Sequence, residues 1–101
     1  DMNHKNQANA FLNALIDKLM DCPPLEVDEL PEGLSILSPN GQYLLNYHSV
    51  TDQLWLSSPV SGAHHFHYKA PNWVCTRTDV LLTHVLQTEL NSPSFSLEGL
   101  V

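Results

Sequence analysis

Basic residues are scarce in this sequence, which has 4 lysines and arginines against 11 aspartates and glutamates and a formal charge of −7. The four cations are spread along the chain as Lys5, Lys18, Lys69 and Arg77. Nucleic acids and anionic membranes require clustered cations, so we expect neither as a partner. A metal cation or a basic protein surface suits this charge better.

Cysteines and long apolar runs are also rare. Cys22 and Cys75 lie far apart in the sequence, which excludes a disulfide framework and a local zinc motif. We expect both to be structural or incidental, because no adjacent histidine or basic residue would lower a thiol pKa. No apolar stretch approaches the ~20 residues that span a bilayer. Nucleophile elbows, phosphate loops and dinucleotide fingerprints are missing too, so motifs predict no enzyme active site.

The first segment of the chain has helical periodicity. Apolar residues follow the i, i+3, i+4 rule over residues 4–21 and predict an amphipathic helix. The helix should end before Cys22, because Pro23 and Pro24 follow that residue. A second helix is predicted over residues 79–90, with Thr78 as its N-cap.

Between the two helices, the apolar pattern changes to strict alternation, which is typical of strands. Tight turns rich in Gly, Pro, Asn and Ser separate about six such segments. They lie at residues 25–28, 34–37, 43–48, 53–57, 63–68 and 73–75. The predicted fold class is therefore α+β, a two-layer α–β sandwich with two helices packed on one face of an antiparallel sheet.

The length of 101 residues, 43% of them hydrophobic, allows one core and so one domain. We place this domain at residues 1–91 and a C-terminal tail at residues 92–101. Apolar residues recur in the tail, so we expect it to pack on the domain. Phe95, Leu97 and Leu100 should lie along the groove between the two helices.

Several segments together resemble one known family. The run QLWLSSPVSG at residues 53–62, with FHY at 66–68 and NWV at 72–74, resembles frataxin and its bacterial CyaY branch. The resemblance covers residues 8–91. It implies the sandwich already predicted, weak iron binding by surface carboxylates, and regulation of iron–sulfur cluster assembly.

Acidic residues concentrate around the end of the first predicted helix. Six of the eleven lie within sixteen residues, namely Asp17, Asp21, Glu26, Asp28, Glu29 and Glu32. A bound cation relieves repulsion among such carboxylates, and their hard oxygens suit Fe²⁺ or Fe³⁺ with little selectivity over Mn²⁺ or Ca²⁺. Composition alone favours a solvated acidic surface, whereas the resemblance implies that iron binds here.

Alternation in two predicted strands directs Asn46, Gln53 and Trp55 toward the outer face of the sheet. A tryptophan with polar neighbours on an open sheet is typical of an interface anchor, and burial beneath a loop or tail is the alternative. In the family that the chain resembles, the matching residues contact a cysteine desulfurase and its iron–sulfur scaffold protein. His65 and Trp73 complete the expected partner-binding set.

Histidines are grouped in the strand after Gly62. His65 and His67 alternate onto one face, and we expect His48 on the same side and His64 toward the core. Two imidazoles so spaced can bind a borderline metal, and protonation at a pH of about 6.5 would add positive charge. Exposed histidines without a role are the alternative.

The resemblance favours a binding and regulatory protein over an enzyme. An iron-storage protein or ferroxidase that forms oligomers with iron is the main alternative, and a sheet-surface interaction module without a metal role is another. We expect a monomer in the absence of iron, located in a mitochondrial matrix or, alternatively, a bacterial cytoplasm. Two unpaired cysteines fit such a reducing compartment.

Overall fold

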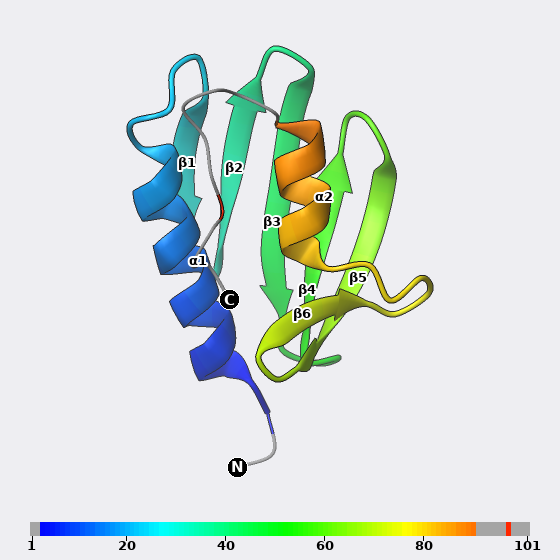
Figure 1. Ribbon diagram of the computed structural model, residues 1–101. Coiled ribbons are helices and arrows are strands. Elements are labelled where there is room, and N and C mark those ends of the chain that lie inside the picture. Colours follow the sequence, from blue (N-terminus) through cyan, green and yellow to red (C-terminus); the bar gives the residue numbers. More distant parts are fainter. Residues whose placement is uncertain (1–2, 91–96, 98–101) are drawn as a thin grey trace.

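The computed structural model describes residues 3–90 and 97, which form two helices and six strands (Figure 1). In chain order these elements are α1 (Lys5–Leu19), β1 (Glu26–Leu30), β2 (Gly33–Ser38), β3 (Gly41–His48), β4 (Gln53–Ser58), β5 (Gly62–Lys69), β6 (Asn72–Cys75) and α2 (Leu82–Glu89). The strands form one sheet in the order β1 to β6, and every neighbouring pair is antiparallel. This arrangement confirms the predicted meander.

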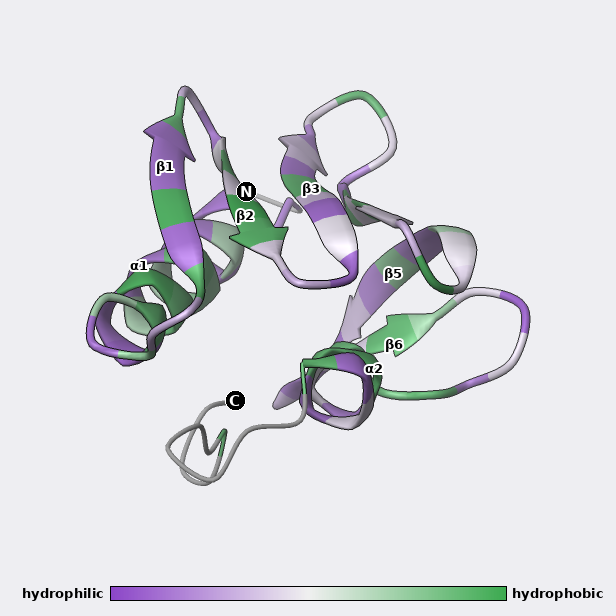
Figure 2. Cartoon of the chain, turned by 90° about the horizontal axis from the view of Figure 1, so that it is seen from above, coloured by the Kyte–Doolittle hydropathy of each residue, from purple (hydrophilic) through white to green (hydrophobic). Residues whose placement is uncertain are grey.

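Strand alternation produces one covered and one open face of the sheet. Leu34, Leu45 and Leu56 are paired across β2, β3 and β4 and are buried beneath the helices. The two helices lie on the same side of the sheet, with α1 along β1 and β2 and α2 over the other half (Figures 1 and 2). The two-layer sandwich is therefore confirmed.

Helix α1 buries the apolar stripe that its sequence predicts. The buried residues are Ala8, Phe11, Leu12, Leu15 and Leu19. The helix ends at Leu19, two residues earlier than predicted, and Asp21 lies in the turn that follows.

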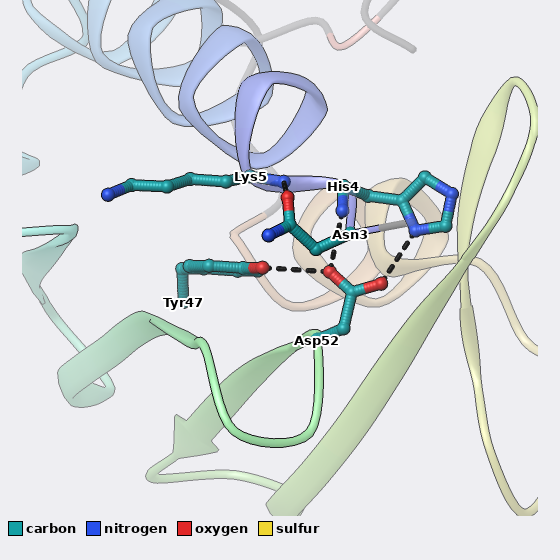
Figure 3. A network of polar contacts seen from close by, with 5 residues as sticks. All are labelled: Asn3, His4, Lys5, Tyr47 and Asp52. Carbon is teal, nitrogen blue, oxygen red and sulfur yellow. Dashed lines mark hydrogen bonds and ion pairs between the residues drawn. The ribbon is translucent and has the colours of Figure 1, made fainter. Parts of the chain in front are cut away.

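The N-terminus of α1 is fixed by a carboxylate from the turn between β3 and β4. Asp52 accepts the backbone N–H of His4 and the His4 ring Nδ1, both at 2.7 Å, and the Tyr47 hydroxyl at 2.8 Å (Figure 3). Because the first N–H groups of a helix lack intrahelical partners, Asp52 caps α1 from 48 residues away. Its φ of 56° is one that Asp and Asn adopt more readily than most residues.

The Asp52 contacts also shift two ionisation equilibria. Burial favours the neutral carboxyl, but the hydrogen bonds from His4 and Tyr47 outweigh it and lower the pKa of Asp52. Burial, the hydrogen bond to Asp52 and the charges of Asp52 and Glu32 raise the pKa of Tyr47 to about 12. Asp52 is therefore an anion and Tyr47 a neutral donor at neutral pH.

Helix α2 begins later than predicted, at Leu82 instead of residue 79, and Thr78 does not cap it. The cause is a contact between segments. The N–H of Cys75 donates to the Val80 carbonyl at 2.8 Å, and Leu81 forms a β-bridge with Val74. These bonds hold residues 80 and 81 extended against β6, so the helix starts only after them.

The last turn of α2 is fixed to the sheet by Glu89. Its Oε1 accepts the hydroxyls of Ser58 at 2.5 Å and Tyr43 at 2.9 Å, and its Oε2 accepts the Ser61 hydroxyl. Although burial favours the neutral acid, these hydrogen bonds lower the pKa of Glu89. Burial and the contact with Glu89 raise the pKa of Tyr43.

The predicted tail is described at one position only. Leu97 is 4% exposed and belongs to the core. Phe95 and Leu100 lie outside the described residues, so their predicted packing stays a prediction.

Candidate docking surface and acidic edge

Trp55 occupies the centre of the open sheet face, in a stack of three rings. The ring centroids of His48 and Trp55 are 3.5 Å apart with planes at 11°, and those of Trp55 and His65 are 4.2 Å apart at 7°. The Trp55 indole Nε1 donates to Gln53 Oε1 at 2.8 Å. Both indole faces and the N–H are therefore engaged, and the ring edge is left for a partner.

Asn46 lies beside this stack and directly opposite Trp55 in the β3–β4 pairing. On its other side it pairs with Gly33 of β2. A Cβ at Gly33 would lie 2.1 Å from Asn46 Oδ1 and 2.5 Å from the Leu45 carbonyl oxygen. The missing side chain at Gly33 thus makes room for the Asn46 amide.

Two exposed leucines extend this surface, and they are not among the surface residues predicted from the sequence. Leu37 is 49% and Leu44 38% exposed. Leu44 shares the outward parity of Asn46 in β3, since Tyr43, Leu45 and Tyr47 are buried. Alternation read strictly through β3 would have identified Leu44, because a leucine at an outward position is an exposed apolar group.

The prediction that Trp73 contacts a partner is wrong. Trp73 is 2% exposed and belongs to the core, where its ring lies 5.1 Å from that of Tyr68. In β6, Trp73 and Cys75 face the helices, so the side chain is not available at the surface.

The histidines separate as the alternation predicts. His65 is exposed in the Trp55 stack, His67 is half-buried, and His48 covers the other indole face. His64 points elsewhere, and its Nε2 lies 2.7 Å from Ser61 Oγ. Within residues 3–90 and 97, no three His, Cys, Asp or Glu side chains converge to hold one metal ion, so the histidines form no such centre.

The six predicted metal-binding acids are not gathered at one point. Asp17 is exposed on α1 and Asp21 lies beyond its end. In β1, Glu29 pairs with the buried Leu34, whereas Asp28 pairs with Ser35 of the opposite parity. The remaining two acids, Glu26 and Glu32, are exposed at the start of β1 and in the β1–β2 turn.

One hollow of about 180 Å³ lies between α1 and the β1–β2 turn. Its lining includes the carboxylates of Glu29 and Glu32 and the amides of Asn9 and Asn13. Four side chains that carry potential metal-ligating oxygen atoms therefore border one cavity. One of them, Glu32, also forms an ion pair with Lys5 at 3.2 Å. Such oxygens fit a hard cation, and the competing lysine makes binding weaker.

The expectation for the cysteines needs one correction. Cys75 is buried, and burial alone raises a thiol pKa. Hydrogen bonds from the Thr78 side chain and from the N–H groups of Arg77 and Thr78, with the charge of Arg77, outweigh burial and lower the pKa of Cys75. The Cys22 thiol donates to the Lys18 carbonyl at 3.0 Å.

Comparison with known proteins identifies the family of this chain. The profile of the frataxin-like domain matches residues 1–94. The chain belongs to the frataxin family. It spans about half the length, or less, of the curated relatives that it matches.

Curated frataxin relatives come from plants and fungi. Mitochondrial frataxin of Arabidopsis thaliana is 33% identical over 94 residues, which cover 84% of this chain and 50% of the relative. The mitochondrial frataxin homologue of Saccharomyces cerevisiae is 30% identical over 86% of this chain and 54% of its own length.

Solved frataxin structures share the fold. A trimeric frataxin from Saccharomyces cerevisiae, complexed with ferrous iron, is 30% identical and superposes with a TM-score of 0.75 over 88% of this chain and 85% of that one. A frataxin from Psychromonas ingrahamii is 17% identical, with a TM-score of 0.76 over 84% of this chain and 82% of its own, and supports the fold alone. Among the described residues, no helix is long and apolar enough to cross a membrane.

Proposed function

We propose that this frataxin-family chain regulates iron–sulfur cluster assembly by docking its open sheet face on a cysteine desulfurase and its iron–sulfur scaffold protein. The Trp55 ring stack is the observation that carries this proposal. Its geometry holds a large aromatic edge in one orientation beside Asn46 and the exposed Leu44. Rigid aromatic anchors dominate protein interfaces because little side-chain entropy is lost when they bind.

The charges around the open sheet face would favour one orientation of the bound partner. Acidic residues gather at the β1 edge, whereas His65 and Arg77 border a hollow of about 230 Å³ at the β5 end. A partner with basic residues against β1 and an acidic residue against His65 and Arg77 would be complementary in only one orientation. The reverse orientation would bring like charges together.

Iron binding is proposed at the acidic edge. The part of this edge that can surround a cation is the hollow lined by Glu29, Glu32, Asn9 and Asn13. Electrostatic attraction of the cation comes from the other exposed acids, Asp17, Asp21, Glu26 and Asp28. Hard oxygen ligands suit Fe²⁺ and Fe³⁺, and the open geometry suits weak, exchangeable binding. In this proposal the iron is cargo or an effector, held long enough to be passed on.

The docking proposal is tested by the rate of cluster formation in a purified desulfurase–scaffold complex. We expect Trp55→Ala to abolish the effect of the protein on that rate. Val50→Ala is the matched control, because Val50 is 92% exposed in the β3–β4 turn and is not one of the stacked residues. An effect of folded Trp55→Ala equal to that of the unsubstituted protein would reject the docking surface.

The iron proposal is tested by anaerobic Fe²⁺ titration followed by NMR line broadening. Broadening should centre on residues around Glu29 and Glu32, and the double variant Glu29→Gln/Glu32→Gln should weaken binding by about tenfold. Asp17→Asn, which removes one acid outside the hollow, should change it by less than about threefold. Equal losses in the two variants would mean that binding is diffuse.

Iron storage or ferroxidase activity is a second candidate, favoured by the trimeric yeast relative complexed with ferrous iron. It requires iron-dependent assembly of this chain. Size-exclusion chromatography with light scattering, combined with oxygen consumption at low iron-to-protein ratio, tests it. A monomer that oxidises Fe²⁺ no faster than buffer would reject this activity.

The mitochondrial names of the relatives support the mitochondrial matrix as the proposed location, with a bacterial cytoplasm as the alternative.

A further inference from the structure

A third hollow lies on the helix side of the sheet and shares Arg77 with the hollow at the β5 end. It has a volume of about 310 Å³ and lies between the β4–β5 turn, the loop after β6 and helix α2. That loop projects outward beside α2 (Figures 1 and 2). The volume equals that of about ten water molecules and reaches the lower end of the range for small-molecule sites.

The hollow contains one of the four cationic side chains of this acidic protein. Arg77 lines it, and no carboxylate lies within 4.0 Å of the guanidinium among the residues that the structure describes. Its one recorded hydrogen bond is a long contact of 3.4 Å to the Ala63 carbonyl. The flat guanidinium therefore keeps most of its five N–H donors for a ligand.

The acid in the same hollow, Glu89, is an anion whose two oxygens are already engaged in hydrogen bonds. Glu89 accepts hydroxyl donors from Ser58, Ser61 and Tyr43 on its two oxygens. Since Ser61 gives its proton to Glu89, Ser61 Oγ accepts from the His64 ring at 2.7 Å, which assigns the proton to His64 Nε2. The carboxylate is thus held by hydroxyl donors and forms no ion pair with Arg77.

The remaining walls are apolar or weakly polar. Val80 and Val85 supply methyl groups from the loop and from α2, and Thr78 and Thr88 add a methyl and a hydroxyl each. His84 completes the rim. An inorganic anion would gain little from these methyl groups, whereas a ligand with a short hydrocarbon body would bury apolar surface on them.

We propose that this hollow binds a small organic carboxylate, with its head group on Arg77 and its hydrocarbon part against Val80 and Val85. Guanidinium and carboxylate match as a two-point hydrogen-bonded pair, which gives the site its preference for this head group. The site shares Arg77 with the hollow at the β5 end and no residue with the ring stack or the iron edge, and binding of a small carboxylate to the isolated chain tests it without the docking partner.

The test is an NMR titration of the ¹⁵N-labelled full chain with sodium butyrate at fixed ionic strength and pH 7. We expect saturable shift changes confined to the backbone amides around Arg77, His84 and Thr88. Butyramide, which has the same shape without the charge, should shift these amides at least about tenfold less at equal concentration. Inorganic phosphate should bind less tightly than butyrate, because it cannot use the methyl groups.

Two test variants, each with a control variant, decide whether the named contacts hold the ligand. Arg77→Gln should weaken butyrate binding by at least about tenfold, and Lys5→Gln, which removes a cation at α1, should leave it unchanged. Because the Arg77 side chain also contacts Ala63 of β5, Thr88→Glu is a second probe. It adds a negative charge from α2 and leaves Arg77 in place, and Thr88→Gln is its neutral control. Unchanged binding by Thr88→Glu, or equal shifts with butyramide, would overturn the proposal.

Discussion

The two tryptophans of this chain lie on opposite faces of the same sheet and have opposite surroundings. Trp73 is buried beneath the helices, and Trp55 lies on the open face between two histidine rings. On the covered face, the polar groups Tyr43 and Tyr47 are each bonded to a carboxylate that fixes a helix end. The covered face stabilises the fold, and the open face is left to bind.

The acids show the same division. Asp52 and Glu89 each accept three hydrogen bonds, whereas the acids of β1 are exposed. A carboxylate that is bonded internally is committed to the fold. One that is exposed and close to its like is available to a cation or to a basic partner.

The largest effect should come from exchanging the two tryptophans for alanine. Trp73→Ala removes a buried indole and should lower the free energy of unfolding by about 3–5 kcal/mol. Trp55→Ala removes a half-buried ring and should cost less than about 1.5 kcal/mol. Urea unfolding followed by circular dichroism measures both. Equal losses would contradict the division between the faces.

Glu89→Gln should have the next largest effect, a loss of about 2 kcal/mol. Gln offers one acceptor oxygen in place of two and brings an NH₂ group toward hydroxyl donors, so at least one bond to Ser58, Ser61 or Tyr43 is lost. Gln87→Ala, on the exposed side of α2, is the control and should change stability little. A variant as stable as the unsubstituted chain would mean that α2 is held by its apolar face alone.

Asp52→Asn should lower the free energy of unfolding by about 1 kcal/mol at pH 7 and should have no effect on it in acid. The folded state lowers the pKa of Asp52 below its ordinary value of about 3.9, so its contribution is present above about pH 4 and is lost as the pH falls through the folded pKa. The stability difference between the two proteins should therefore shrink from pH 7 to below pH 3. A difference that is constant with pH would assign the loss to shape instead of charge.

The sequence predicted the parts of this fold that depend on local pattern. Alternation in β3 assigned Tyr43, Leu45 and Tyr47 to the core and Asn46 to the open face, because side chains on a strand have a period of two. The same reasoning placed His48 near His65, where the structure has them on either side of Trp55.

The errors concern contacts between distant segments. The start of α2 depends on the pairing of residues 80 and 81 with β6. The local sequence around Thr78 does not predict this pairing. Asp52 and Glu89 find their donors up to 48 residues away, so neither network is visible in a local window. The expectation that Trp73 binds a partner is wrong, because alternation within a strand as short as β6 does not say which parity faces the helices.

The smallest stability effect should come from removing charge at β1 with Glu26→Gln and Asp28→Asn together. Neither side chain has a hydrogen bond or ion pair recorded among the described residues, and both are exposed, so no internal partner is lost. Relief of like-charge repulsion should leave stability unchanged or slightly higher, most clearly at low salt. Fe²⁺ binding should nevertheless weaken by about threefold, because long-range attraction is lost. If stability fell while iron binding held, these acids would belong with Asp52 and Glu89 in maintaining the fold.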